Sequence, residues 1–340
     1  MQSLLQAYYM RAFPAKWDVE VRDVVNITTG WESEMYSFDV EYGRPEERRH
    51  ERLILRIYPG DDAEAKSARE FYGMRQLHKA GYPVPQVLIL ESENSPFGQP
   101  FVIMERIEGQ ELASLMFGAP KERQQKLLTL FCELFVRLHR LDWRPLACHV
   151  TCGDMDDPYA PVDRELNRWR AYLDRFRSSA FLEVLEWLES RREQVPCLRP
   201  SPVHWDYHPG NVLLRDDGSG VVIDWTQLDI SDPRFDLAWT LVLISSYRGP
   251  EWRERILREY ERLAEAPVQQ IEYFEAAACF KRLGSVVVSL LHGPEKMGMR
   301  PEAQARIRQD MEAFKRVYGL LLERTDIRLP EVQGLLASLS

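Results

Sequence analysis

Alternating apolar and polar positions predict a β-rich first hundred residues. Runs with β-branched or alternating apolar residues, each closed by Gly or Pro, occupy 24–30, 35–43 and 52–60. In the third run the odd-numbered residues from Leu53 onward share one face, which leaves Arg56 on the other. A helical pattern with an Asp at its start and a Gly at its end follows over 61–81. Strand-like runs then return at 84–90 and 99–109.

After Gly109 the period of the apolar residues changes from that of strands to that of helices. The segment 121–141 has apolar residues at the spacing of an amphipathic helix. Further helices are expected near 163–176, 180–193, 232–247, 251–265, 268–292 and 301–325. The change of pattern predicts a domain boundary near 107–110.

Two short strand-like runs interrupt the helical half and carry many polar groups. Residues 211–214 and 221–224 are typical of strands, and the intervening RDDGSG is typical of a hairpin turn. Such a hairpin would place Asn211 opposite Asp224, or one position away. Buried carboxylates are costly unless charge or hydrogen bonds compensate them, so these groups require partners.

The polar groups of this hairpin suit magnesium-dependent phosphoryl transfer. Asn211 and Asp224 offer the hard oxygen ligands that Mg²⁺ prefers. Asp206 lies on the loop that enters the first strand and can face the same point. Transfer of a phosphoryl group to a hydroxyl needs a metal to neutralise phosphate charge and a free carboxylate to accept the hydroxyl proton. The pattern therefore favours a kinase reaction.

The motif HWDYHPGN followed by VVIDW resembles the catalytic and metal-binding loops of the aminoglycoside phosphotransferase/choline kinase family, which has a protein-kinase-like fold. DISDPRFDLAW is similar to the next segment of that family. The resemblance covers roughly residues 24–240. It implies an α+β, bilobal fold. The expected N-lobe, 1–107, has a small antiparallel sheet and one main helix, and the larger, mostly helical C-lobe, 108–340, carries the catalytic hairpin.

The resemblance also implies roles for single residues. Asp206 would be the catalytic base, and Asn211 and Asp224 would bind Mg²⁺. LILRIY and AREFYGMRQL are similar to the strand and helix whose basic and acidic residues pair beside the nucleotide's α- and β-phosphates. These residues are Arg56 and Glu70.

FVIMERIEG resembles the hinge that binds the adenine. Met104 would border the base, and the carbonyl of Glu105 and the amide of Ile107 would hydrogen-bond its edge. In the catalytic segment, His204 would be a structural anchor of the loop. Asp236 would hydrogen-bond the backbone of that loop.

Three positions depart from the family pattern. Trp205 stands where the family most often has Gly, so the loop or its neighbours must accommodate an indole. Arg56 replaces the Lys of protein kinases, although many relatives carry Arg, and its planar fork can still hold Glu70 and phosphate. The nucleotide-covering loop contains only Gly30 and has no glycine-rich motif.

Composition limits the partners and the compartment. The 340 residues carry a formal net charge of −9, which argues against a nucleic-acid partner. The N-terminus lacks the pattern of a signal peptide, and no apolar run reaches the roughly 18 residues of a membrane span. Five cysteines without paired spacing favour reduced thiols. We expect a cytoplasmic protein without a membrane partner.

The expected function is therefore transfer of the γ-phosphoryl of ATP or GTP to a hydroxyl of a small acceptor. Candidate acceptors include an aminoglycoside-like antibiotic, an amino alcohol or a sugar, and the acidic run 153–165 could favour a cationic one. The sequence leaves the acceptor, the choice between ATP and GTP, and the oligomeric state open.

Two functions other than that of a kinase are compatible with the sequence. A metal-dependent phosphoesterase could use the cluster His204, Asp206 and His208, although this leaves Asn211 and Asp224 unexplained. His208 is more often a residue that shapes its own Pro-Gly turn. The second alternative is a pseudokinase that binds nucleotide without catalysis.

Overall fold

The computed structural model describes residues 1–28, 33–150, 154–176, 179–293 and 308–338. The chain divides into two compact units. The first combines Met1–Gln110 with Leu213–Thr226, and the second combines Glu111–Val212 with Gln227–Ser340.

The hairpin at 213–226 belongs to the N-terminal unit, whereas the sequence placed all residues after 107 in one C-terminal lobe. Long-range contacts explain the difference. Arg215 forms an ion pair with Glu105 at 2.9 Å, and the Val222 amide donates to the Pro83 carbonyl at 2.9 Å. Such contacts leave no periodic trace in the sequence.

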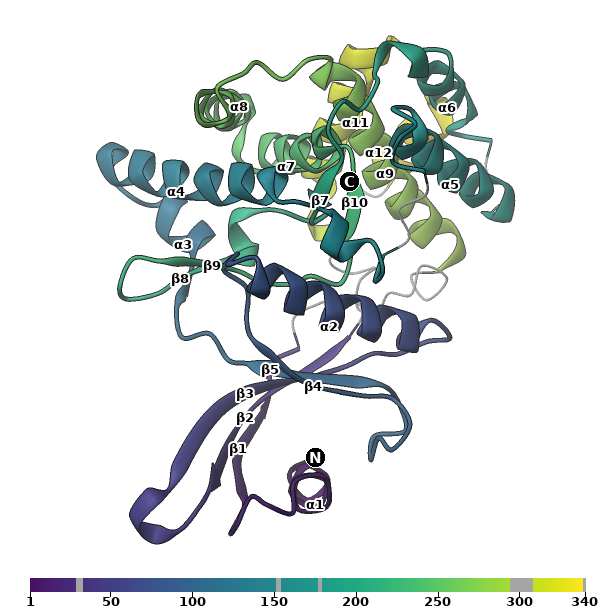
Figure 1. The fold of residues 1–340 in the computed structure, drawn as a ribbon. Coiled ribbons are helices and arrows are strands. Elements are labelled where there is room, and N and C mark those ends of the chain that lie inside the picture. The colour runs from purple at the N-terminus through teal and green to yellow at the C-terminus, as the bar shows by residue number, and fades with distance from the viewer. Residues whose placement is uncertain (29–32, 151–153, 177–178, 294–307, 339–340) are drawn as a thin grey trace. The chain divides into compact units, whose positions relative to one another are not determined.

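The first unit is built on an antiparallel five-stranded sheet in the order β1-β2-β3-β5-β4 (Figure 1). Its strands overlap the five runs that the alternation predicted. They are β1 (Glu20–Asn26), β2 (Glu34–Tyr42), β3 (Arg49–Ile57), β4 (Val87–Glu91) and β5 (Phe101–Glu105). A smaller sheet has the order β6-β8-β9, with bounds Gln110–Glu111, Val212–Leu214 and Gly220–Val222.

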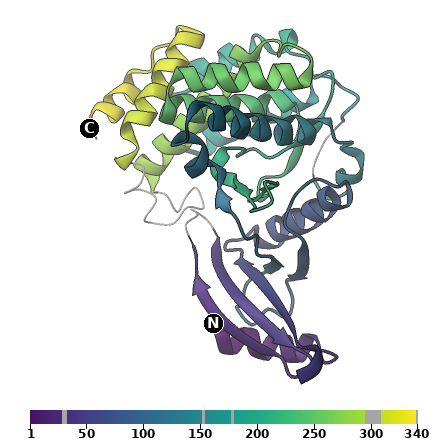
Figure 2. The same cartoon turned by 90° about the vertical axis from the view of Figure 1, so that its left-hand side faces the viewer.

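Helix α1 (Gln2–Ala12) covers one face of the five-stranded sheet (Figure 2). Its Leu5, Tyr8 and Tyr9 are buried in one cluster with Leu53 and Leu55 of β3. No helix was predicted from the sequence over these residues. The i, i+3, i+4 spacing of the three buried residues is the signal that could have found it.

Helix α2 (Ala63–Lys79) packs against β4 and β5. It confirms the helix predicted over 61–81 and buries Glu70, Met74 and Leu77. Residues paired across an antiparallel ladder point to the same face of the sheet, and Arg56 is paired with Val102. Neither residue belongs to the buried cluster that contains α1. Arg56 thus lies on the face of the sheet opposite to the α1 cluster.

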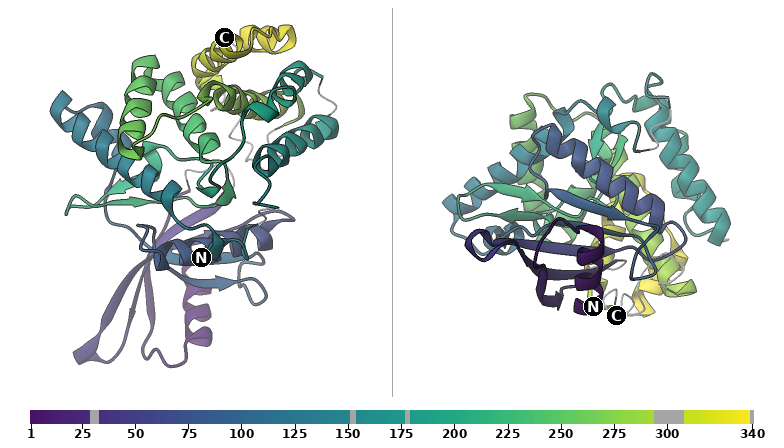
Figure 3. Two further views of the ribbon diagram at one scale, coloured as in Figure 1. Left: turned by 45° about the horizontal axis from the view of Figure 1, so that its top comes forward. Right: turned by 60° about the horizontal axis from the view of Figure 1, so that its bottom comes forward.

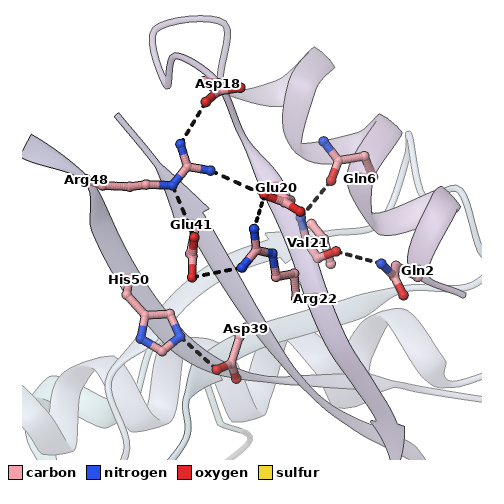
Figure 4. A network of polar contacts seen from close by, with 10 residues as sticks. All are labelled: Gln2, Gln6, Asp18, Glu20, Val21, Arg22, Asp39, Glu41, Arg48 and His50. Carbon is pink, nitrogen blue, oxygen red and sulfur yellow. Dashed lines mark hydrogen bonds and ion pairs between the residues drawn. The ribbon is translucent and has the colours of Figure 1, made fainter. Parts of the chain in front are cut away.

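The outer part of this sheet carries a network of exposed charges (Figure 4). Arg48 forms ion pairs with Asp18 at 2.7 Å and Glu41 at 3.1 Å, and His50 lies 2.7 Å from Asp39. Exposed ion pairs of this kind contribute about 0–1 kcal/mol each. The network therefore adds little to the stability of this unit.

The second unit is mostly helical, and most of its helices overlap the segments predicted from the sequence, whereas the helices at 112–117 and 330–338 were not predicted. Its bounds are α3 (Leu112–Phe117), α4 (Lys121–Arg140), α5 (Ala160–Phe176), α6 (Leu182–Glu189), α7 (Pro233–Arg248), α8 (Pro250–Ala264), α9 (Ile271–His292), α11 (Met311–Thr325) and α12 (Pro330–Ser338). Helices α11 and α12, yellow in Figure 3, lie side by side. Of the helix expected over 301–325, α11 covers residues 311–325, and residues 301–307 lie outside the described residues.

A two-stranded antiparallel sheet lies inside this helical unit. It pairs β7 (Ser201–Val203) with β10 (Asp229–Ser231), and it packs against α4 and α7. Its six residues are all buried. In the described part of the chain, no helix is long and apolar enough to cross a membrane.

Candidate active site

Arg56 lies at the centre of a buried polar cluster in the first unit. Its Nη1 donates to Glu70 Oε1 at 2.7 Å, and its Nη2 donates to Asp224 Oδ1 at 2.8 Å. Its Nε donates to the Ser33 hydroxyl at 2.9 Å. A strand, a helix and the end of a hairpin thus meet at one guanidinium. The sequence predicted the Arg56–Glu70 pair but not the contact with Asp224.

The cluster holds more negative than positive charge. The Tyr58 hydroxyl also donates to Glu70, which is 1% exposed. Burial raises the pKa of Glu70, while the Arg56 charge opposes that shift and Asp224 adds to it. One guanidinium therefore faces two carboxylates. A divalent cation at the exposed side of Asp224 would restore the balance.

Asp224 lies just beyond β9 in a strained backbone conformation. Its φ of 65° is in the left-handed region, which is uncommon for residues other than Gly and is frequent at functional sites. The next residue fixes this geometry, because the Trp225 indole N–H donates to the Val222 carbonyl at 2.9 Å. The Thr226 hydroxyl lies 3.2 Å from Asp224 Oδ1. The side chain is 38% exposed, so solvent and ligands can reach it.

The three residues predicted to bind adenine lie at the end of β5. Met104 is buried and pairs with Ile54, on the same face of the sheet as Arg56. Glu105 uses its side chain to bind Arg215, and its amide donates to the Gln86 carbonyl at 2.8 Å. Ile107 follows the strand and is half-buried. Residues 29–32 of the nucleotide-covering loop, which include Gly30, lie outside the described residues.

The second unit positions the loop that follows β7. The Asp236 carboxylate, fully buried at the start of α7, accepts from the backbone amides of His204 at 2.7 Å and Trp205 at 2.8 Å. These are the hydrogen bonds that the resemblance implied. His139 of α4 lies 3.3 Å from the same carboxylate, and its other ring nitrogen is 2.8 Å from the Tyr260 hydroxyl. This role of His139 was not predicted from the sequence.

Tyr207 anchors the centre of this loop. Its ring stacks on Phe135 with centroids 3.9 Å apart, and its hydroxyl donates to the Phe131 carbonyl at 2.8 Å. The Thr240 hydroxyl donates to the Tyr207 carbonyl at 2.6 Å. Two helices thus hold the residue next to Asp206 from both sides.

Asp206 keeps one carboxylate oxygen largely free of strong contacts. Its Oδ1 accepts from the Trp239 indole N–H at 2.9 Å, and its Oδ2 lies 3.7 Å from His208 Nε2. The side chain is 33% exposed. The Asn211 amide nitrogen donates to the Asp206 carbonyl at 2.9 Å, which fixes the amide and leaves its oxygen as an acceptor. Trp239 was not foreseen from the sequence.

The cluster His204, Asp206 and His208 does not have the geometry of a metal centre. His208 Nδ1 accepts from the Gly210 amide at 3.1 Å, so it shapes the Pro-Gly turn as expected. His204 is fully buried. Over the described residues, no group of three His, Cys, Asp or Glu could hold a metal ion. The phosphoesterase alternative gains no support from this arrangement.

Trp205 has a backbone conformation that Gly adopts more easily than other residues. Its φ is 63°, in the left-handed region that favours Gly. The indole is 5% exposed and lies against Phe235, with ring centroids 5.5 Å apart. The buried position of the indole beside Phe235 shows how the structure accommodates Trp205.

In the acidic run 153–165, two carboxylates accept hydrogen bonds from backbone amides of the same loop. Asp154 accepts from the Asp156 amide at 3.0 Å, and Asp157 accepts from the Tyr159 amide at 2.9 Å. Asp163 forms an ion pair with Arg192. These contacts are those of a solvated loop and a helix start.

We expect Asp236→Asn to loosen the catalytic loop. An amide offers one accepting oxygen instead of two, so one buried backbone N–H loses its partner. The cost of an unsatisfied buried donor is about 1–3 kcal/mol. Chemical denaturation should show this loss in the free energy of unfolding. Asp156→Asn on the exposed loop is the control, and an equal, small change in both variants would contradict the prediction.

Comparisons with known proteins agree with this geometry. The family model described as Phosphotransferase enzyme family matches residues 23–271. Mouse Acyl-CoA dehydrogenase family member 10 is 30% identical over 181 residues, which are 51% of this chain and 16% of that protein. Hygromycin-B 4-O-kinase of Escherichia coli is 23% identical over 238 residues, covering 64% and 61% of the two chains. The chain thus spans less than two thirds of the length of these curated relatives.

A solved structure shares the fold over almost the whole chain. It is a thermostable mutant of aminoglycoside phosphotransferase APH(4)-Ia, in a ternary complex with AMP-PNP and hygromycin B. The TM-score is 0.58 at 20% identity, and the match covers 93% of this chain and 97% of the other. The α+β, kinase-like fold expected from the sequence is confirmed.

Proposed function

Because the chain belongs to the phosphotransferase enzyme family, we propose that it is a small-molecule kinase that transfers the γ-phosphoryl of ATP or GTP to a hydroxyl group. The observation that carries this proposal is the contact of Arg56 with both Glu70 and Asp224. A phosphate-binding cation, its helix partner and a metal-binding carboxylate are the parts that phosphoryl transfer requires.

The proposed nucleotide site uses the face of the sheet that carries Arg56. Met104 lies on that face and would border the adenine, while the backbone of Glu105 and Ile107 would bind its edge. Arg56, held in place by Glu70, would contact the α- and β-phosphates. A planar guanidinium suits this role because it can bind a carboxylate and a phosphate oxygen at once.

Asn211 and Asp224 are the proposed ligands of Mg²⁺. Both flank the β8-β9 hairpin in the sequence, and both offer an oxygen atom. The excess negative charge around Arg56 and the exposed side chain of Asp224 fit a hard divalent cation. When bound, Mg²⁺ would neutralise charge on the transferred phosphoryl group.

Asp206 is the proposed catalytic base. Its Oδ1 is held by Trp239, so Oδ2 is oriented to accept a proton from the acceptor hydroxyl. The hydroxyl oxygen then forms its new bond to the γ-phosphorus as the bond to the β,γ-bridging oxygen breaks. The fixed backbone from His204 to Tyr207 keeps the carboxylate in position for this step. A positioned base of this kind contributes about 10²–10⁴-fold in rate.

Calorimetric titration with ATP, with and without Mg²⁺, tests the nucleotide site. Since Asp224 is a proposed ligand, wild-type protein should bind ATP more tightly with Mg²⁺, and Asp224→Ala should lose the metal-dependent part of the affinity. Asp216→Ala, in the exposed hairpin turn, is the matched control. If folded protein bound neither ATP nor GTP, the kinase proposal would be rejected. Binding without transfer to any acceptor would favour the pseudokinase alternative.

A further inference from the structure

Lys281 of α9 lies between two indole rings in the second unit. Its Nζ is 4.5 Å from the ring centroid of Trp205 and 4.7 Å from that of Trp239. Trp239 is also the residue that donates to Asp206 Oδ1 at 2.9 Å. A lysine ammonium is therefore held one indole ring away from the proposed base. Contacts with two aromatic faces stabilise a cation without neutralising it.

The positive charge of Lys281 has no ionic partner among the described residues. Its one hydrogen bond there is a long contact of 3.5 Å to the amide oxygen of Gln227. Burial lowers the pKa of Lys281, and the carboxylates of Glu165, Asp206 and Asp236 oppose that shift from a distance. The side chain is only half-buried, so a ligand can reach it.

Each of the three surrounding carboxylates is already engaged by another group. Glu165 forms an ion pair with Arg168 at 2.9 Å. Asp236 accepts from two backbone amides, and Asp206 accepts from Trp239. None of these three carboxylates forms an ion pair with Lys281 in the described part of the chain. A half-buried ammonium that keeps unused donors can bind a further acceptor.

We propose that Lys281 recognises an anionic group, a carboxylate or a phosphate, on the acceptor substrate. The inference deepens the proposed kinase function and rests on it, because the anion would lie close to the hydroxyl that Asp206 orients. It replaces the expectation of a cationic acceptor, whose ammonium groups Lys281 would repel. Trp205 and Trp239 position the ammonium by stacking on it, which gives the departure at Trp205 a role in specificity.

Matched acceptors separate this role from a structural one. We would compare four acceptors that share one hydroxylated carbon skeleton and differ in a single group, which is a carboxylate, a phosphate, a carboxamide or an ammonium. Wild-type protein should give the highest kcat/KM for the carboxylate or the phosphate, and the better of these identifies the anion. Lys281→Met should raise KM for that acceptor about 10–100-fold, the range of a hydrogen bond to a charged group. KM for ATP should not change.

Two further variants sharpen the outcome. Lys281→Arg keeps the charge and should retain most of the preference for the anion, whereas Lys281→Glu should shift it toward the ammonium compound. An equal loss for all four acceptors in Lys281→Met would overturn the proposal and leave a structural role. So would a wild-type preference for the ammonium or the carboxamide.

A binding measurement decides the matter independently of turnover. Reductive ¹³C-methylation labels lysines and keeps them charged. The ring currents of the two indoles should change the chemical shift of the Lys281 methyl signal. The signal is assigned by its absence from the spectrum of Lys281→Arg. Titration with the carboxylate or phosphate compound should shift this signal with saturation, and the ammonium compound should not. No shift with either anion would refute the proposal. Failure to bind ATP would instead refute the kinase function, so the two failures are distinguishable.

Discussion

Replacing Asp206 with Asn is expected to lower kcat by about 10²–10⁴-fold, the contribution of a positioned general base. The amide has nearly the same shape, and its oxygen can still accept from the Trp239 indole, as Asp206 Oδ1 does at 2.9 Å. The orientation of the side chain is thus preserved while its ability to take a proton is lost. Steady-state kinetics with any productive acceptor gives the measurement.

The matched control for this variant is Asp216→Asn, because Asp216 is exposed in the turn of the β8-β9 hairpin. Its kcat should equal that of wild type. Calorimetry should show unchanged binding of ATP and Mg²⁺ in Asp206→Asn, since Asp206 is not a proposed ligand. A kcat within about threefold of wild type would remove Asp206 from the role of base.

Local patterns were sufficient to predict most elements, because strands and helices leave their period in the sequence. The face of β3 that carries Arg56 followed from alternation alone. The hydrogen bonds of Asp236 to the loop backbone followed from the family motif. Helix α1 was missed because its apolar face has only three buried residues.

Long-range contacts could not be predicted in the same way. Asp224 and Arg56 are 168 positions apart in the sequence, and no local pattern around either residue indicates their contact. The cluster around Lys281 gathers residues from a loop and two helices. A signal existed there, because Lys281 and the adjacent Arg282 interrupt an otherwise largely apolar stretch of α9. A charge at such a position needs a polar environment or a ligand.

Removing Glu70 is expected to destabilise the first unit by about 3–5 kcal/mol, the cost of breaking a buried ion pair. Glu70→Ala takes the partner from Nη1 of Arg56, which is 6% exposed, and from the Tyr58 hydroxyl. Chemical denaturation should show the loss. Glu64→Ala, at an exposed position of the same helix, should change stability by less than about 0.5 kcal/mol.

The double variant Arg56→Met/Glu70→Leu distinguishes a stabilising pair from a functional one. Apolar residues of similar volume often replace a buried ion pair at little cost, so the double variant should be more stable than Glu70→Ala. Asp224, being 38% exposed, can exchange Arg56 for water. ATP binding should nevertheless be lost, because the proposed contact with the phosphates is gone. Recovery of ATP binding together with stability would show that the pair serves the fold and not the nucleotide.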